Sequence, residues 1–426
     1  MEMAKFFKGR LWRDRNFMLF WSGESVSLLG SEVTVIVLPS LAVFVFGAGA
    51  ATVGALISLQ WIPYVVLGPI VGVWADRVSR RMLMIVSNMA RALILGWLPV
   101  AAALDVLTIE QIYVAAVLKG SMDVVFQISY HAYIPSLIDR EDLVEGNTKT
   151  EFSKSAAILF GRSLGGVLIA GFGAARAVMF DALSFVVATI TLLFIDKREE
   201  PRTAAGQERG LAAVWLEMRQ GFTLVTRTRL YRFLLVISTS GNFAVSMMTA
   251  TLFSFVYRDL GLSARDLGLA MGVGGAAMVV GALLAQPLNN RWGMGPTLIV
   301  GHAVLGVAIL ILPLAALGAP LTILIVSQVL TLFPVPLFNV GLLTILQSVT
   351  PLPLMGRLNG ISLPLVWGAN ALGAALAGVL ATVFGSVVCL VLAGLLVLST
   401  IIWIVMGSIH RIGAKVPREY EVAVPN

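Results

Sequence analysis

Hydrophobic residues along this chain gather into twelve long runs that are separated by short polar stretches. The runs lie at about 17–45, 52–75, 82–103, 109–131, 151–173, 175–195, 230–257, 266–288, 296–317, 320–346, 357–383 and 385–409. About 20 apolar residues suffice for a helix to cross a bilayer, and backbone that faces lipid must satisfy its own hydrogen bonds. The pattern therefore predicts an all-α integral membrane protein with twelve transmembrane helices.

The composition indicates that lipid, rather than water, covers much of the surface. Of the 426 residues, 58% are hydrophobic and 12% are charged, with a mean hydropathy of +0.91, whereas about a quarter of the residues in a soluble domain are charged. The single cysteine, Cys389, excludes disulfide frameworks and metal sites built on cysteine clusters. The first run is too long for a signal peptide, so we expect it to remain as the first helix.

The basic residues are distributed unevenly between the two sets of loops. The loops on the side of the N-terminus carry 24 lysines and arginines, whereas the opposite loops carry only Arg176, Arg258 and Arg265. The positive-inside rule then predicts a multi-pass protein of the cell membrane with both termini in the cytoplasm. Because topology accounts for the net charge of +7, we expect contact with membrane lipid and no nucleic-acid partner.

A stretch rich in arginine and glutamate divides the runs into two sets of six. We expect an N-terminal six-helix half at 1–195, a cytoplasmic linker at 196–229, a C-terminal six-helix half at 230–410 and a cytoplasmic tail at 411–426. A shift by half the chain length places Phe20 on Phe233 and Gly68 on Gly281. Duplicated halves imply a substrate site between them at the midplane and alternating access by rocking.

The loop after the second run carries a recognisable motif. It reads Gly72-Val-Trp-Ala-Asp76-Arg77-Val-Ser79-Arg80-Arg81 and resembles Gly-x-x-x-Asp-Arg-x-Gly-Arg-Arg of the major facilitator superfamily, with Ser79 in place of the second glycine. In that family the cluster latches the cytoplasmic side, so the resemblance assigns a gate to Gly72, Asp76, Arg77, Arg80 and Arg81, supported by Arg91. An anion here can cap a neighbouring helix N-terminus; loop anchoring by positive charge is the alternative.

Other stretches are similar to the drug:proton exporter branch of that superfamily, which includes macrolide and tetracycline efflux proteins and siderophore exporters. They are Tyr133-Ile-Pro135, Leu143-Val-Glu-Gly-Asn147, Asp181-Ala-Leu-Ser-Phe185 and Gly356-Arg357-Leu-Asn359. The resemblance covers essentially the whole chain. It implies the major facilitator fold of two six-helix halves, a monomer, no cofactor, and the proton gradient as the energy source.

Glycines in two of the runs predict close helix packing. Gly161-Arg162-Ser163-Leu164-Gly165-Gly166 resembles the exporter motif Gly-Pro-x-x-Gly-Gly, with Arg162 in place of proline. The glycines favour close approach of helices, and the arginine becomes a candidate partner for a carboxylate or an anionic substrate. Gly272-Val-Gly274-Gly275 lies in a spanning run without the βαβ unit that a dinucleotide site requires, so we interpret it as packing too.

Charged residues inside the runs are the main candidates for function, because they are costly in a membrane and usually face a cavity. In the first half they are Glu24, Glu32, Arg91, Lys119, Asp123, Arg162 and Asp181, whereas the second half offers neutral polar residues that include Asn242 and Asn339. Lys119 and Asp123 are spaced i, i+4, which is also consistent with a self-neutralising structural pair. Asp181 lies near the outer end of its run, where we expect it to reach interfacial water.

The two glutamates of the first run have the strongest claim to coupling or binding. Eight residues correspond to 800°, which brings Glu24 and Glu32 to the border of one polar helix face. Burial disfavours a charged carboxyl, and Glu32 lies nearer the bilayer centre. We therefore expect Glu32 to carry the proton and Glu24 to attract substrate positive charge. By resemblance to the family, Lys119 lies across the cavity from them.

These observations predict a proton-coupled antiporter that exports small amphiphilic drugs or natural products. An exporter of anionic metabolites such as siderophores is the alternative, with Arg162 and Lys119 as anchors. A membrane-embedded enzyme or a receptor is less well supported, since the sequence shows no nucleophile–base motif, no metal-binding motif, no P-loop and no sizeable extramembrane module.

Overall fold

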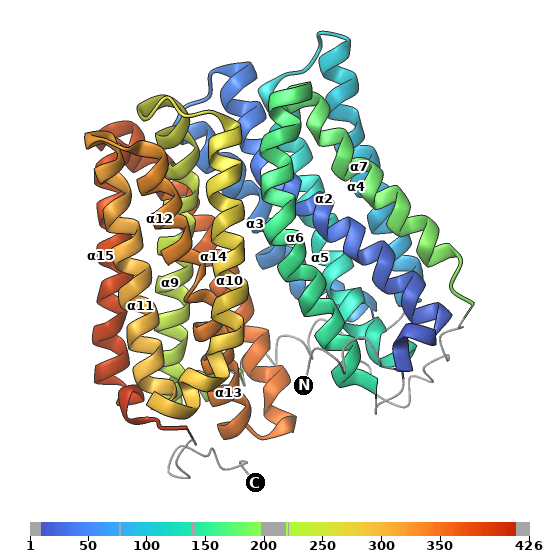
Figure 1. The fold of residues 1–426 in the computed structure, drawn as a ribbon. Helices are drawn as coiled ribbons and strands as arrows, with labels where there is room; N and C mark the ends of the chain where they lie inside the picture. The colour runs from blue at the N-terminus through green and yellow to red at the C-terminus, as the bar shows by residue number, and fades with distance from the viewer. Residues whose placement is uncertain (1–9, 76–77, 139–141, 197–218, 220, 415–426) are drawn as a thin grey trace.

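The computed structural model describes residues 10–75, 78–138, 142–196, 219 and 221–414. In these ranges the backbone is mostly helical, and twelve helices are long and apolar enough to span a membrane. Figure 1 shows the helices running side by side from one end of the molecule to the other. We call the end at which the first long helix begins and the last one ends the lower end, and the opposite end the upper end, as they appear in Figure 1.

The first six spanning helices form one half. A short 3-10 helix η1 (Arg10–Arg13) precedes α2 (Arg15–Phe46), α3 (Ala50–Ala75), α4 (Arg80–Ala103), α5 (Ile109–Leu137), α6 (Leu143–Phe172) and α7 (Ala174–Leu193). α2 packs against α6 and α7, and α4 lies between α5 and α7. Side-chain caps fix several helix starts, because Asp14, Ser79 and Thr108 each accept a hydrogen bond from a backbone N–H of the first turn.

The other six spans form the second half. They are α9 (Arg229–Ser254, continued by η3, Phe255–Asp259), α10 (Ala264–Trp292), α11 (Met294–Ile311, followed by η4, Leu312–Leu317), α12 (Pro320–Leu332) with α13 (Val335–Val349), α14 (Leu352–Phe384) and α15 (Ser386–Met406, followed by η5, Ile409–Arg411). The expectation of two six-helix halves is thus confirmed. The stretch 197–218 of the expected linker lies outside the described residues.

One expected helix differs from the structure. The run at 320–346 was expected to be continuous, but α12 ends at Leu332 and α13 begins at Val335. Pro334 lies in this break. Its ring removes a backbone N–H and clashes with the preceding turn, so the tenth span is made of two shorter helices.

Three pairs of successive helices are each joined through one glycine. Gly173 links α6 to α7, Gly293 links α10 to α11 and Gly385 links α14 to α15, with φ of 80°, 92° and 88°. A side chain is strained at such a φ. These glycines therefore let the chain reverse between long helices without a loop.

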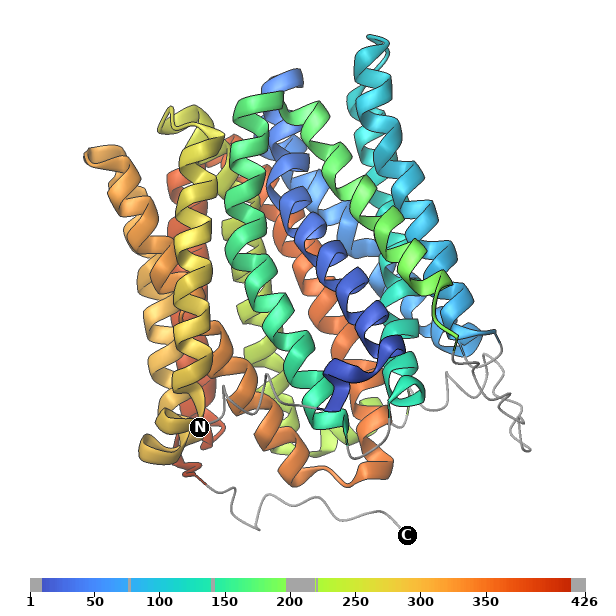
Figure 2. The ribbon, with the colours of Figure 1, turned by 45° about the vertical axis from the view of Figure 1, so that its right-hand side comes forward.

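The two halves are packed most closely toward the upper end, as Figures 1 and 2 show. α3 contacts α14 there, and a Cβ on Gly54 would lie 2.5 Å from the carbonyl oxygen of Ala374. α6 contacts α10, where a Cβ on Gly268 would lie 2.9 Å from the Cα of Gly166. Since neither site has room for a side chain, glycine is what allows this closure.

Polar contacts add to the closure at the upper end. The Ser40 hydroxyl of α2 hydrogen-bonds the Tyr257 hydroxyl of η3 at 2.7 Å, and Arg258 donates to the carbonyl oxygen of Gly47. The packing role expected for Gly272 and Gly275 is also confirmed, because a Cβ there would meet Ser163 and Leu159 of α6. The present conformation is therefore closed at its upper end.

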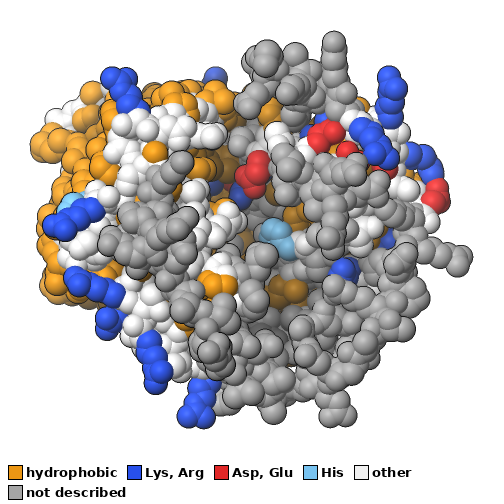
Figure 3. Space-filling model, turned by 90° about the horizontal axis from the view of Figure 1, so that it is seen from below, with side chains coloured by type: hydrophobic (Ala, Val, Ile, Leu, Met, Phe, Trp, Pro, Cys, Tyr) orange, Lys and Arg blue, Asp and Glu red, His pale blue; other side chains and the backbone are white. Residues whose placement is uncertain are grey.

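Viewed from below, the molecule is recessed between its halves. Figure 3 shows acidic side chains and a histidine near the middle of this face, inside a rim that carries lysines and arginines. Around the sides, large hydrophobic side chains are exposed, such as Leu283 at 73% and Leu93 at 68%. An exposed apolar belt of this kind is what a lipid-facing surface requires.

Candidate functional site

Three charged side chains of α4 and α5 form a buried network in the N-terminal half. Asp123 accepts from Arg91 at 3.0 Å through one carboxylate oxygen and from Lys119 at 2.8 Å through the other. The Lys119–Asp123 pair is the one expected from the i, i+4 spacing. Arg91, which the sequence grouped with the loop arginines, instead points its guanidinium into this network.

Arg91 is held in a fully enclosed position. Its residue is 4% exposed, and its guanidinium carbon lies 4.1 Å from the ring centre of Phe126 and 4.3 Å from that of Phe185. Asn88, one helical turn earlier, accepts a further hydrogen bond from it. Two aromatic faces and two polar partners offset the cost of burying a cation.

A second ion pair joins α2 to α6. The Arg162 Nε lies 2.8 Å from the Glu32 Oε2, and the two side chains are 17% and 21% exposed. The helices approach closely here, since a Cβ on Gly161 would lie 2.7 Å from the Glu32 Cβ. Of the two partners that the sequence suggested for Arg162, a carboxylate or an anionic substrate, the present conformation contains the carboxylate.

Glu24 differs from Glu32 and Asp123, which both form ion pairs. It is half-buried on α2, and among the described residues no cation lies within the 4.0 Å of an ion pair. Arg91 is the cation whose positive charge acts on the Glu24 carboxyl group. Glu24 is therefore a carboxyl without a direct ion-pair partner in the described part of the chain.

The surroundings of Asp181 differ from those expected from the sequence. It was expected to reach interfacial water, but it is 0% exposed. It lies against α2, where a Cβ on Gly30 would be 2.7 Å from its Oδ1. Neither spacing nor hydropathy reveals this burial, because it depends on the rotation of α7 against α2.

The second half contributes neutral polar groups. The amide of Asn242 on α9 donates to the carbonyl oxygen of Ser238 at 2.9 Å, and Asn339 on α13 is exposed. The ring of buried His302 packs edge-on against Phe338, with 5.0 Å between ring centres. The charge asymmetry expected from the sequence is thus retained in three dimensions.

The gate motif lies at the lower end and is only partly described. Asp76 and Arg77 lie outside the described residues, Gly72 lies in α3, and Arg80 begins α4 after the Ser79 cap. Arg81 donates hydrogen bonds of 2.9 Å to the carbonyl oxygens of Leu192 and Leu193. A cation at the C-terminal end of α7 also suits the negative end of the helix dipole.

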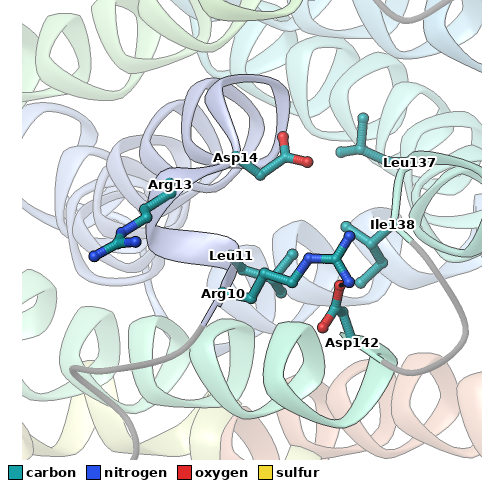
Figure 4. Close-up of a pocket in the computed structure, with 7 residues that line it drawn as sticks. All are labelled: Arg10, Leu11, Arg13, Asp14, Leu137, Ile138 and Asp142. Atoms are coloured by element: carbon teal, nitrogen blue, oxygen red, sulfur yellow. Dashed lines mark ion pairs between the residues drawn. The ribbon is translucent and has the colours of Figure 1, made fainter.

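A cavity of about 270 Å³ lies at the lower end, next to η1. Figure 4 shows its lining residues, which are Arg10, Leu11, Arg13, Asp14, Leu137, Ile138 and Asp142. Arg10 lies 3.8 Å from Asp142, and Asp14 caps α2. None of the predicted site residues lines this cavity, so the buried charges, and not this pocket, form the candidate site.

In the described part of the chain, no group of three His, Cys, Asp or Glu side chains is arranged to hold a metal ion. The site instead contains acids paired with bases, namely Asp123 with Arg91 and Lys119, and Glu32 with Arg162. Such an arrangement can bind and release protons and can attract a charged ligand, because each group affects the ionisation of its neighbours.

Comparisons with known proteins show the family of the chain. The model of the Major Facilitator Superfamily matches residues 20–369 and 235–423. The multidrug efflux pump Tap of Mycolicibacterium fortuitum is 24% identical over 371 residues, which cover 84% of this chain and 87% of Tap. Macrolide efflux protein A of Streptococcus pyogenes is 25% identical over 254 residues, covering 57% of this chain and 56% of that protein.

Solved structures share the fold at low identity. The crystal structure of the nucleoside transporter NupG superposes with a TM-score of 0.71 and 13% identity, covering 92% of this chain and 99% of NupG. At this identity the likeness concerns the arrangement of the helices alone.

Proposed function

Because the chain belongs to the major facilitator superfamily, we propose that it is a proton-coupled exporter of amphiphilic organic cations, drugs or natural products among them. The observation that carries the proposal is the half-buried Glu24, which has no ion-pair partner among the described residues. The three buried cations described in the same half, Arg91, Lys119 and Lys149, are already paired with acids. Similarity to two efflux proteins supports export as the direction.

The conformation supports alternating access. The halves meet through glycines at the upper end and are recessed between them at the lower end (Figure 3). With the basic loops in the cytoplasm, the lower end is the cytoplasmic one and the present state faces inward. An exporter loads its substrate in this state, and rocking of the halves then opens the other side.

The ion pairs favour a cationic over an anionic substrate. Arg162 and Lys119 are the anchors that an anionic metabolite would need, but Glu32 and Asp123 already bind them. An anion would have to replace a carboxylate that lies within 2.8 Å of each cation. A cation needs to displace only a proton from Glu24.

The same contacts change which glutamate we propose as the proton carrier. Glu32 was expected to carry the proton, but its carboxyl group is engaged in an ion pair with Arg162 of α6. Glu24 has no such partner among the described residues. We therefore assign competition between proton and substrate to Glu24, and interhelical pairing to Glu32.

The remaining expectations become part of the proposal. We place the gate at Gly72, Asp76, Arg77, Arg80 and Arg81, with Arg81 tying the start of α4 to the end of α7. Asn242 and Asn339 are proposed as neutral contacts of the substrate from the second half. The protein would act as a monomer in the cell membrane.

The proposal is tested with purified protein in liposomes that have an acidic interior. We expect ethidium, a lipophilic cation, to accumulate inside in response to the pH gradient, and fluorescein, an anion, not to accumulate. Glu24→Gln should reduce pH-driven ethidium uptake at least tenfold, because the side chain then holds neither proton nor charge. Exposed Glu151 provides the matched control, and Glu151→Gln should transport normally. Accumulation of fluorescein instead of ethidium would favour the anion exporter.

A further inference from the structure

Apart from the Lys149–Glu145 pair nearer the lower end, seven acidic and basic side chains lie inside the N-terminal half, and we call these seven the buried charge set. The cations are Arg91, Lys119 and Arg162, and the acids are Glu24, Glu32, Asp123 and Asp181. Counted over the described residues, three positive groups face four carboxyls. If every group were ionised, the set would carry one uncompensated negative charge.

An uncompensated charge is energetically unfavourable where water is excluded. Desolvating an unpaired ion costs several kcal/mol, so a buried group neutralises by binding a proton instead. The ion pairs show which acids can remain ionised without binding a proton. Asp123 contacts two cations and Glu32 contacts one. The surplus carboxyl is therefore Glu24 or Asp181.

Asp181 is the more deeply buried of these two acids. It has 0% exposure, and its Oδ2 is a buried oxygen without a hydrogen-bond partner among the described residues. The Ser184 hydroxyl lies 2.8 Å from the backbone carbonyl oxygen of Asp181 and 3.2 Å from its Oδ1. A carboxylate with one unsatisfied oxygen in a sealed position is a poor resting state, whereas a protonated acid carries no charge there.

The helices packed around Asp181 define the charges that act on it. Lys119 and Asp123 of α5 and Arg91 of α4 are its charged neighbours, and α2 presents the Thr34 hydroxyl. α6, which also contacts α7, carries Arg162 in its pair with Glu32. Glu24 shares Arg91 as a neighbour, so the two surplus acids border the same network.

We propose that Asp181 is a second proton-carrying residue, which together with Glu24 holds one proton when the transporter is empty. Resting on the proposed function, the exchange then follows from charge balance. A monovalent cation beside Glu24 supplies the missing positive charge, so neither acid needs its proton. The O–H bond of the carboxylic acid breaks, the proton leaves to water, and both acids remain as carboxylates.

The experiment measures proton release in weakly buffered detergent solution as ethidium binds. Wild-type protein should release about one proton per bound ethidium. Asp181→Asn leaves three cations and three acids, so release should fall to about zero while ethidium still binds. Adding Lys119→Met to this variant recreates the surplus acid and should restore about one proton.

The control makes the same chemical change outside the set. Asp105 is exposed and has a φ of 55°, a conformation that asparagine also adopts readily. Asp105→Asn should release as many protons as wild type. If wild type itself releases none, the proposed proton coupling is wrong. If wild type and Asp181→Asn both release about one proton, Asp181 is not a carrier.

A second measurement does not require the Asp181 variant to fold. Infrared difference spectra of wild type, recorded on ethidium binding, should show the loss of a carboxylic acid C=O band. Because the Ser184 hydroxyl lies within hydrogen-bond distance of the Asp181 carboxyl group, Ser184→Ala should shift the frequency of that band. A band of unchanged frequency in Ser184→Ala would assign the proton to another acid and overturn the proposal.

Discussion

At the scale of single residues, the N-terminal half stabilises its buried charges by pairing them across helices. Arg91 is enclosed by two aromatic rings and bound to Asp123, and Arg162 is bound to Glu32. Breaking a buried pair on one side is costly because the remaining charge loses its partner, whereas removing both partners costs less. The Arg162–Glu32 pair allows this difference to be measured.

We expect Arg162→Met to destabilise the protein by about 1–3 kcal/mol, since Glu32 then lies unpaired against α6. The double variant Arg162→Met, Glu32→Gln should recover most of this loss, because no charge is left. The measurement is the melting temperature of the detergent-solubilised protein. Equal melting temperatures for the single and double variants would show that the pair contributes no interaction energy.

At the scale of helices, closure of the upper end depends on small residues of α6 and α10. Gly166 and Gly268 bring the two backbones together, and each occupies the space that a side chain on the other would need. Tight contact of this kind favours one of the two arrangements of the halves. The balance between the inward-facing and outward-facing states should therefore respond to a single methyl group.

Gly268→Ala should open the upper end, because its Cβ would lie 2.9 Å from the Cα of Gly166 and 3.0 Å from the Arg162 carbonyl oxygen. Spin labels at the exposed upper positions 105 and 317 report the separation of the halves. We expect a larger population at long distance in the variant. Gly171→Ala is the matched control, since nothing lies within 4 Å of that Cβ, and it should retain the wild-type distribution. The same distribution in Gly268→Ala would disprove the packing argument.

At the scale of the whole molecule, the proposed direction of transport depends on which end faces the cytoplasm. We propose from the basic loops that the lower end faces the cytoplasm, and the recess of Figure 3 opens at that end. If the orientation were reversed, the same structure would face outward. The side of the membrane on which two exposed positions lie distinguishes between these two orientations.

We expect a membrane-impermeant maleimide to label Asp105→Cys in intact cells and to label Arg227→Cys only after lysis. Both positions are exposed, and they lie at opposite ends because Asp105 follows the end of α4 and Arg227 precedes the start of α9. The buried Cys389 is replaced by serine as background. The ratio of labelling before and after lysis is the measurement. Labelling of Arg227→Cys alone in intact cells would place the termini outside and reverse the proposed direction.

The sequence by itself determined the features that depend on local pattern. Hydrophobic runs of sufficient length set the number of spans, because each spanning helix satisfies its backbone internally. The helical period predicted the Lys119–Asp123 contact, which lies four residues apart on one helix. The loop motif and the glycine-rich runs indicated the family and the packing of Gly272 and Gly275.

Only the tertiary structure decided which distant residues meet. Arg91 reaches Asp123 across 32 positions and Arg162 reaches Glu32 across 130. These contacts depend on how each helix is rotated and shifted against its neighbours, and hydropathy does not encode either. The same packing buried Asp181 against Gly30. It left Glu24 without a cation at ion-pair distance among the described residues.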